Sequence, residues 1–234
     1  MSNETGPIKS GVEDNLNCVR DIANLAGQGR LIVVSGPSGA GKSSLVRLTL
    51  GRLDRLHFSV SHTTRGARGT ERQGIDYYFV SKEEFLVMRE RGEFLEYAEV
   101  YGQLYGTSRR EIEKATSQGL DVLLDIDVQG ADQVRHKFPE AITTLVLPPS
   151  REVLEERLRA RNLNRPEDLE RRLRTAAAEV KRFREFDYIV VNDDLERAAS
   201  QLEAIIRAER QRVERQAETA KTIISGFGGD LIYG

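Results

Sequence analysis

The sequence predicts an α/β fold in which a parallel β-sheet is covered by helices on both faces. Short apolar segments of strand length alternate with longer segments that have helical periodicity. Strands that alternate with helices form right-handed βαβ units, and a parallel sheet built in this way is buried on both faces. The five segments that predict strands are 31–34, 58–61, 122–127, 142–147 and 188–192.

The composition is that of one main domain with little net charge. The chain has 234 residues, a formal net charge of −2 and 31% charged residues, so no basic field indicates a nucleic-acid partner or a membrane surface. No apolar run approaches the roughly 20 residues that span a bilayer, and the first residues lack a secretion-signal pattern. The single cysteine, Cys18, excludes an intrachain disulfide. We therefore expect a cytoplasmic protein, and the sequence does not decide between a monomer and a homo-oligomer.

A glycine-rich motif follows the first predicted strand and opens a predicted helix over 43–53. Its sequence GPSGAGKS matches GxxxxGK[ST], the pattern of loops that bind the phosphates of ATP or GTP. Backbone N–H groups converge on phosphate oxygens in such loops, while Lys42 can reach the β- and γ-phosphates and Ser43 can ligate Mg²⁺. The predicted ATP-binding residues here are Gly36, Pro37, Ser38, Gly39, Ala40, Gly41, Lys42 and Ser43. Because unrelated enzymes share this loop, it does not identify the phosphate acceptor.

Two segments interrupt the regular alternation. Residues 61–107 are rich in Arg, Gly and Tyr, which predicts an inserted lobe. Residues 150–185 have helical patterns on both sides of Pro166, which predicts two helices joined by a turn that form a mobile cover. Outside the main domain, 30–210, we expect an N-terminal extension, 1–29, and a C-terminal tail, 211–234. An amphipathic helix over 195–214 is predicted to lead into a Gly-rich end.

Four separated motifs together resemble the guanylate kinase family. The sequence SHTTRGARGTERQGIDYYFV lies in the lobe, with GPSGAGKS before it and FLEYAEVYGQLYGT and LLDIDVQG after it. The resemblance runs from about residue 30 to about residue 207. It implies a P-loop NTPase-type sheet with an inserted GMP-binding lobe at about 61–107 and a helical lid at about 150–185. The implied reaction is transfer of the γ-phosphoryl group of ATP to GMP, with Mg²⁺ as cofactor.

The resemblance also implies a GMP site in the lobe. Arg65 and Arg68 would hold the GMP phosphate, because a planar guanidinium makes bidentate bonds to phosphate oxygens. Glu96 would accept the N1–H and N2–H of guanine, and AMP would leave this carboxylate unpaired. The family usually has serine at the position of Thr107, so the hydroxyl is kept. The implied GMP-binding residues are Ser61, Arg65, Arg68, Tyr77, Glu96, Tyr105, Thr107 and Asp127.

Two aspartates close the strand predicted for 122–127. Asp125 and Asp127 stand at alternate positions, so both are expected to face the sheet edge where the phosphates lie. The resemblance implies that Asp125 helps Ser43 to hold Mg²⁺, partly through water. For either aspartate, capping of the following helix is an equally good reading.

By the same resemblance, the lid carries catalytic arginines. Arg157 and Arg161 are four residues apart and so share a helical face, while Arg172 falls on the next helix. With Lys42, these arginines would neutralise the transferring phosphoryl group. Arg161 is followed by Asn162, where the family commonly has glycine. Asn192, at the end of the last predicted strand, would contact the ATP base.

Two alternative functions remain at this point. Guanylate-kinase-like modules of scaffold proteins bind peptides through the same lobe, but they generally carry damaged phosphate loops, and the loop here is intact. A P-loop kinase for another acceptor, such as AMP or a phosphorylated sugar, is the second alternative. Glu96 and Thr107 favour guanine over both acceptors.

Overall fold

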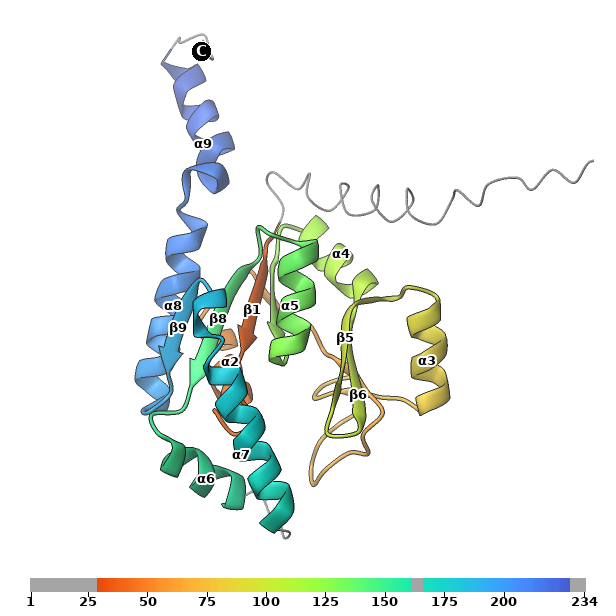
Figure 1. Cartoon of the computed structure of the whole chain (residues 1–234). Helices are drawn as coiled ribbons and strands as arrows, with labels where there is room; N and C mark the ends of the chain where they lie inside the picture. The colour runs from red at the N-terminus through yellow and green to blue at the C-terminus, as the bar shows by residue number, and fades with distance from the viewer. Residues whose placement is uncertain (1–28, 161–165, 228–234) are drawn as a thin grey trace, which may run out of the picture.

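A computed structural model describes residues 29–160 and 166–227, and its main sheet has five parallel strands in the order β2-β7-β1-β8-β9 (Figure 1). The predicted parallel α/β fold is confirmed. The strands are β1 (Leu31–Ser35), β2 (Leu56–Phe58), β7 (Asp121–Asp125), β8 (Ile142–Leu147) and β9 (Tyr188–Val191).

Alternate residues of β1 supply the two halves of the core. Ile32 and Val34 pack in one buried cluster with residues of α2 (Lys42–Leu50) and α8 (Leu195–Arg210). Leu31 and Val33 point to the opposite face and pack in a second cluster with residues of α4 (Arg109–Ser117) and α5 (Val128–Lys137). Because side chains alternate across a strand, an unbroken apolar strand requires cover on both faces, and these helices provide it.

A second sheet lies in the chain between β2 and β7. Its order is β4 (Tyr78–Phe79), β3 (His62–Thr63), β6 (Gln103–Ser108) and β5 (Phe94–Val100), with β5 and β6 antiparallel. The helix α3 (Lys82–Glu90) covers it, and the stacked rings of Phe85 and Phe94, 4.5 Å between centroids, form the centre of this small core. We call residues 62–108 the lobe.

The strand predicted for 58–61 was wrong in its extent. The main-sheet strand β2 ends at Phe58, and the chain leaves the main sheet before β3 begins at His62 in the lobe. Ser59 still donates a backbone N–H to the carbonyl of Leu123 at 3.2 Å, and Ser61 accepts one from Tyr78 at 2.9 Å. An apolar–polar alternation therefore continues across a point where the backbone changes its hydrogen-bonding partner from one sheet to the other.

Two helices form a hairpin beside the end of the main sheet (Figure 1). They are α6 (Arg151–Ala160) and α7 (Pro166–Val180), and the short 3₁₀ helix η1 (Phe183–Glu185) follows. Their shared face is a separate buried cluster that consists of Leu154, Leu158, Leu169 and Ala176. The two helices predicted on either side of Pro166 are present, and residues 161–165 between them lie outside the described residues.

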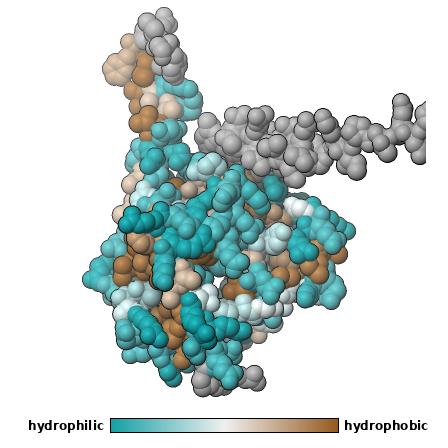
Figure 2. Space-filling model, in the orientation of Figure 1, coloured by the Kyte–Doolittle hydropathy of each residue, from teal (hydrophilic) through white to brown (hydrophobic). Residues whose placement is uncertain are grey.

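The C-terminal segment is more helical than we predicted. The helix α8 ends at Arg210, and a further helix, α9 (Val213–Gly226), occupies most of the predicted tail. Figure 1 shows α9 extending away from the body, and Figure 2 shows apolar residues on this projection, where Val213 and Phe227 are 80% and 87% exposed. The N-terminal extension, apart from Gly29, lies outside the described residues. Within the described ranges no helix is long and apolar enough to cross a membrane.

Candidate active site

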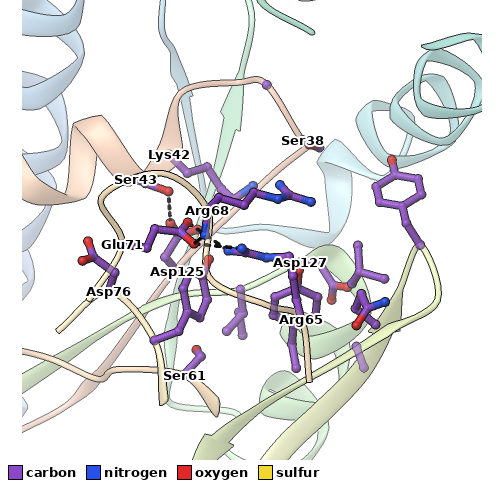
Figure 3. Close-up of a pocket in the computed structure, with 18 of the residues that line it drawn as sticks. Ser38, Lys42, Ser43, Ser61, Arg65, Arg68, Glu71, Asp76, Asp125 and Asp127 are labelled. Carbon is purple, nitrogen blue, oxygen red and sulfur yellow. Dashed lines mark hydrogen bonds and ion pairs between the residues drawn. The ribbon is translucent and has the colours of Figure 1, made fainter. Parts of the chain in front are cut away.

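A cleft of about 1660 Å³ separates the phosphate loop from the lobe (Figure 3). Its walls come from the loop after β1, the carboxyl end of β7, the lobe and the cleft-facing side of α7. Figure 3 shows Lys42 and Ser43 of the loop facing Arg65, Arg68 and Glu71 of the lobe across this space. Open α/β sheets bind ligands outside the carboxyl ends of their strands, and the cleft lies at that edge.

The phosphate loop adopts a backbone that its glycines make possible. Gly36, Gly39 and Gly41 have φ values of 139°, 93° and 91°, in the region that disfavours other residues. A Cβ on Gly36 would lie 2.2 Å from the carbonyl oxygen of Val146, so the loop passes directly against β8. The α2 helix begins at Lys42, which places its first N–H groups at the cleft and favours an anion there.

Lys42 and the residues behind the loop fix its shape. Lys42 Nζ donates to the carbonyl of Gly36 at 2.6 Å and is thereby held over the loop. From behind, Asn192 Nδ2 donates to the carbonyl of Ala40 at 2.8 Å, and Arg157 donates to the carbonyls of both Ala40 and Asn192, at 3.3 and 2.9 Å. Asn192 is buried and, like Arg157, is not among the residues that line the cleft. Both residues support the loop in this structure, and their roles toward ATP stay predictions.

Ser43 and Asp125 form an oxygen pair at the mouth of the loop. The Ser43 hydroxyl donates to Asp125 Oδ2 at 2.9 Å, although the residues are 82 positions apart in sequence. Asp125 ends β7, as predicted, but Asp127 does not belong to the strand: it is the N-cap of α5 and accepts the N–H of Gly130 at 2.7 Å. The reading of Asp127 as a helix cap is thus confirmed. Its second carboxylate oxygen is buried without a hydrogen-bond partner among the described residues.

Glu96 is a buried carboxylate at the far end of the cleft. It is 3% exposed and accepts a hydrogen bond from the Thr107 hydroxyl at 2.5 Å. Burial raises the pKa of Glu96 to about 7, against the effect of the Thr107 hydrogen bond. A Cβ on Gly130 would lie 2.4 Å from Glu96 Oε2, so the carboxylate fits only against a residue without a side chain. Among the described residues no cation forms a salt bridge with Glu96, and a buried carboxylate with a shifted pKa is a candidate functional group.

Two arginines and two tyrosines of the lobe line the same cleft as Glu96. Arg65 lies buried, with its guanidinium carbon 5.1 Å from the centre of the Tyr77 ring and its Nε 3.3 Å from the Tyr105 hydroxyl. Burial raises the pKa of Tyr77 to about 12, so its hydroxyl remains a donor. Arg68 and Ser61 also line the cleft. Thr107 reaches the site through Glu96 rather than by lining the cleft.

Glu71 is a member of this cluster that sequence reasoning missed. Its two carboxylate oxygens accept from Arg65 Nη1 and Nη2 at 2.8 and 2.9 Å, and one of them also accepts the backbone N–H of Arg68 at 2.8 Å. Although burial disfavours the guanidinium charge, the hydrogen bonds from Arg65 to Glu71 and Tyr105 keep the pKa of Arg65 above its usual value. The sequence signal was a lone glutamate after two spaced arginines, in a segment where most charges face solvent.

Of the three predicted lid arginines, Arg172 lines the cleft. It donates from Nη1 to the Ser38 hydroxyl at 3.3 Å, while its Nε is buried and has no hydrogen-bond partner among the described residues. Burial lowers the pKa of Arg172 from its usual value. Arg161 lies outside the described residues. Two more cleft residues that we did not predict are Tyr101, at the tip of the lobe hairpin, and Glu179, whose pKa burial raises.

Together, the parallel sheet, the phosphate loop after β1 and the arginine cluster that faces it define a P-loop phosphotransferase. The family model for guanylate kinase matches residues 28–209. The chain therefore belongs to the guanylate kinase family, whose members transfer a phosphoryl group from ATP to GMP and form GDP.

Individual relatives are similar to this chain over most of their length. A guanylate kinase of Salmonella typhimurium is 48% identical to it, over 87% of this chain and 99% of the relative. A guanylate kinase of Vibrio cholerae is 47% identical, over 86% of this chain and 98% of the relative. The crystal structure of guanylate kinase from Anaplasma phagocytophilum superposes with a TM-score of 0.73 at 35% identity, and covers 87% of this chain and 98% of that one. The similarity thus includes the loop, the lobe and the helical hairpin.

Proposed function

We propose that this chain phosphorylates GMP by direct in-line transfer, with the donor held by the phosphate loop and the acceptor held by the lobe. An oxygen of the GMP phosphate attacks the γ-phosphorus of ATP, and the bond from that phosphorus to the β-phosphate oxygen breaks. The attacking oxygen is already anionic, so no general base is needed, and catalysis consists of positioning and charge stabilisation. The observation that carries the proposal is a single cleft with a phosphate loop on one wall and buried Glu96 with Arg65 on the other.

On the donor side, the residues Gly36 to Ser43 would hold the ATP phosphates. Backbone N–H groups and the start of α2 face the phosphate oxygens, and Lys42 would turn from the carbonyl of Gly36 toward the β- and γ-phosphates. Asn192, which supports the loop at Ala40, would lie near the ATP base. Because ATP and GMP are cytoplasmic nucleotides, the proposal locates the reaction in the cytoplasm.

The oxygen pair of Ser43 and Asp125 fits Mg²⁺. Mg²⁺ takes hard oxygen ligands and usually binds through one or two protein groups together with substrate phosphates and water. Within the described ranges no group of three or more His, Cys, Asp or Glu side chains could hold a metal alone, which agrees with such a shared site. Ser43 and Asp125 would hold the ion, which when bound neutralises phosphate charge.

On the acceptor side, the lobe would bind both ends of GMP. Arg65, Arg68, Tyr77 and Tyr105 would donate to the GMP phosphate, and the aromatic rings around Arg65 limit its motion. Glu96 would accept the two guanine N–H groups, oriented by Thr107, with Ser61 and Asp127 beside the base. Adenine lacks the N1–H donor, so AMP binding would leave the buried carboxylate unpaired.

The α6–α7 hairpin would act as the cover. Arg172 lines the cleft, and its buried Nε–H has no hydrogen-bond partner among the described residues; this side chain would contact the transferring phosphoryl group. Arg157, now bonded to the carbonyls of Ala40 and Asn192, would act from behind the loop, and Arg161 is a proposed partner that lies outside the described residues. Exclusion of water by the cover would prevent hydrolysis of ATP.

The test is ADP release by the purified protein with Mg-ATP and GMP, compared with Lys42→Ala and with wild type in excess chelator. We expect GMP-dependent turnover that falls by roughly 10²–10³-fold in Lys42→Ala, the loss typical of removing one preorganised charge-stabilising group. Chelation is expected to abolish turnover, and supplied Mg²⁺ to restore it. Tight binding of ATP and GMP without turnover would instead favour a binding module.

A further inference from the structure

Tyr101 occupies a backbone position that disfavours tyrosine. Together with Gly102 it forms the two-residue turn between β5 and β6, and the two residues have φ values of 52° and 79°. Hairpin turns of this kind need positive φ at both central positions and therefore favour Asn, Asp or Gly at the first. Among the described non-glycine residues only Arg55 shares this feature. A bulky residue in left-handed conformation stores strain, which persists where the side chain has a function.

The Tyr101 side chain spans from the lobe to α7. Its ring centre is 4.5 Å from the guanidinium carbon of Arg172 and 5.3 Å from that of Arg171, and its hydroxyl lies near Thr175. Arg171 and Arg172 are consecutive on α7, and Thr175 is four and three positions further on, which places it beside both of them one turn along the helix. A single side chain therefore connects the hairpin of the lobe to the helix that carries a cleft arginine.

Arg172 is held between Tyr101 and the phosphate loop. The ring covers one side of the guanidinium, and Ser38 accepts from Nη1 at 3.3 Å. The remaining buried Nε–H has no partner among the described residues, in a side chain that lines the cleft. The contact between a cation and the face of an aromatic ring strengthens as water is removed, and both side chains of this pair are half-buried. Tyr101 thus fixes the orientation of a donor that is not yet used.

We propose that Tyr101 is a positioning residue that orients the Arg172 guanidinium toward the transferring phosphoryl group. Because Tyr101 belongs to the lobe, the orientation of Arg172 then depends on where the lobe lies. The inference rests on the proposed function for the identity of the reaction. Tyr101 extends from β5, the strand that carries Glu96, so a lobe that has closed on its acceptor carries the ring with it. The strained turn is retained because asparagine or glycine at 101 would relax the backbone but remove the ring from Arg172.

The experiment compares Tyr101→Asn, which suits positive φ, with Tyr101→Phe, which keeps the ring, and with Tyr97→Ala as a matched control. Tyr97 lies on β5, the strand that leads into the turn, is 40% exposed, and contacts Arg89 of α3. Two readouts are measured: kcat and KM for GMP with Mg-ATP, and hydrogen exchange of 166–180 without nucleotides. The exchange measurement does not depend on the identity of the acceptor, and so separates a failure of this inference from a failure of the proposed function.

For Tyr101→Asn we expect kcat to fall roughly 5- to 30-fold, the range of a desolvated cation–π contact, with KM for GMP within about threefold. Exchange of α7 rises, and the melting temperature is equal to or above that of the wild type. Tyr101→Phe restores most of kcat, and Tyr97→Ala changes neither readout. The inference is overturned if Tyr101→Asn leaves kcat or α7 exchange unchanged. It is also overturned if KM for GMP rises while kcat is kept, because Tyr101 would then contact the acceptor.

Discussion

The hydroxyl of Thr107 donates a 2.5 Å hydrogen bond to the carboxylate of Glu96, and both side chains are buried. One oxygen of Glu96 is thus oriented by its neighbour on β6, while the other lies against Gly130 at the start of α5. The geometry leaves the acceptor lone pairs of one carboxylate for a ligand that enters the cleft. In the proposed function, guanine recognition depends on that carboxylate.

Replacement of Glu96 tests this dependence. In Glu96→Gln one oxygen acceptor becomes an N–H donor that opposes a guanine N–H. We expect kcat/KM for GMP to fall roughly 10- to 150-fold, which corresponds to about 1.5–3 kcal/mol for hydrogen bonds to a charged group. The KM for ATP should change less than threefold in steady-state assays. An equal loss for both substrates would mean that the substitution disturbs the whole cleft.

The pKa of Glu96 predicts a pH dependence of GMP use. Because burial raises this pKa to about 7, the carboxyl group of the free protein is protonated below that pH and ionised above it. Only the ionised form accepts both guanine N–H groups, so kcat/KM for GMP should fall by up to tenfold per pH unit below about pH 7. The GMP phosphate also titrates, but it does so in the same way with every variant. Glu96→Gln is therefore the control, and its kcat/KM for GMP should lack the part of the fall below pH 7 that comes from protonation of Glu96.

Gly130 should resist a substitution that usually stabilises helices. Alanine is favoured over glycine within a helix by about 1 kcal/mol, yet a Cβ here would meet Glu96 Oε2 at 2.4 Å. We expect Gly130→Ala to raise KM for GMP about tenfold or more and to leave the melting temperature unchanged or lower. Gly51→Ala is the matched control, because its nearest Cβ contact is 3.5 Å and its φ is −72°. Normal GMP kinetics in Gly130→Ala would show that Glu96 does not need this space.

Glu71 should influence the acceptor and leave the donor unaffected. Its carboxylate holds both terminal nitrogens of Arg65, so Glu71→Gln removes one charge-assisted bond and loosens the guanidinium. We expect KM for GMP to rise about tenfold, with kcat and KM for ATP within threefold. The exposed Glu90 of α3 offers the same substitution as a control, Glu90→Gln, in the same lobe. A lower KM for GMP in Glu71→Gln would mean that Glu71 competes with the phosphate.

The parts of the site with a local sequence pattern could be predicted. The phosphate loop and Ser43 follow from a motif of eight residues between a strand and a helix, and Asp125 follows from its place at the end of an apolar strand. Glu96 and Thr107 have no such pattern. They were identified from the resemblance to guanylate kinases, and only the structure shows the bond between them.

Other features depend on contacts that are distant in sequence or on competing local signals. The alternation through 58–61 continues where the chain changes sheets, so the pattern contains no sign of the break. Asp127 lies beyond the end of β7 and caps α5, because its carboxylate accepts the backbone N–H of Gly130. The glycines at 226, 228 and 229 led us to expect a tail, although the preceding residues form α9. Tyr101 could not be predicted, since its partners on α7 are about 70 residues away.

The central claim is tested most directly by a competition in one vessel. The protein is incubated with γ-labelled Mg-ATP and equal concentrations of GMP, AMP, CMP and UMP, and the labelled products are separated by anion exchange. Our account predicts label in GDP, with little in the other diphosphates or in inorganic phosphate. Label chiefly in ADP, CDP or UDP would contradict the assignment of Glu96 as the guanine-reading carboxylate, and label only in inorganic phosphate would contradict phosphoryl transfer to a nucleotide.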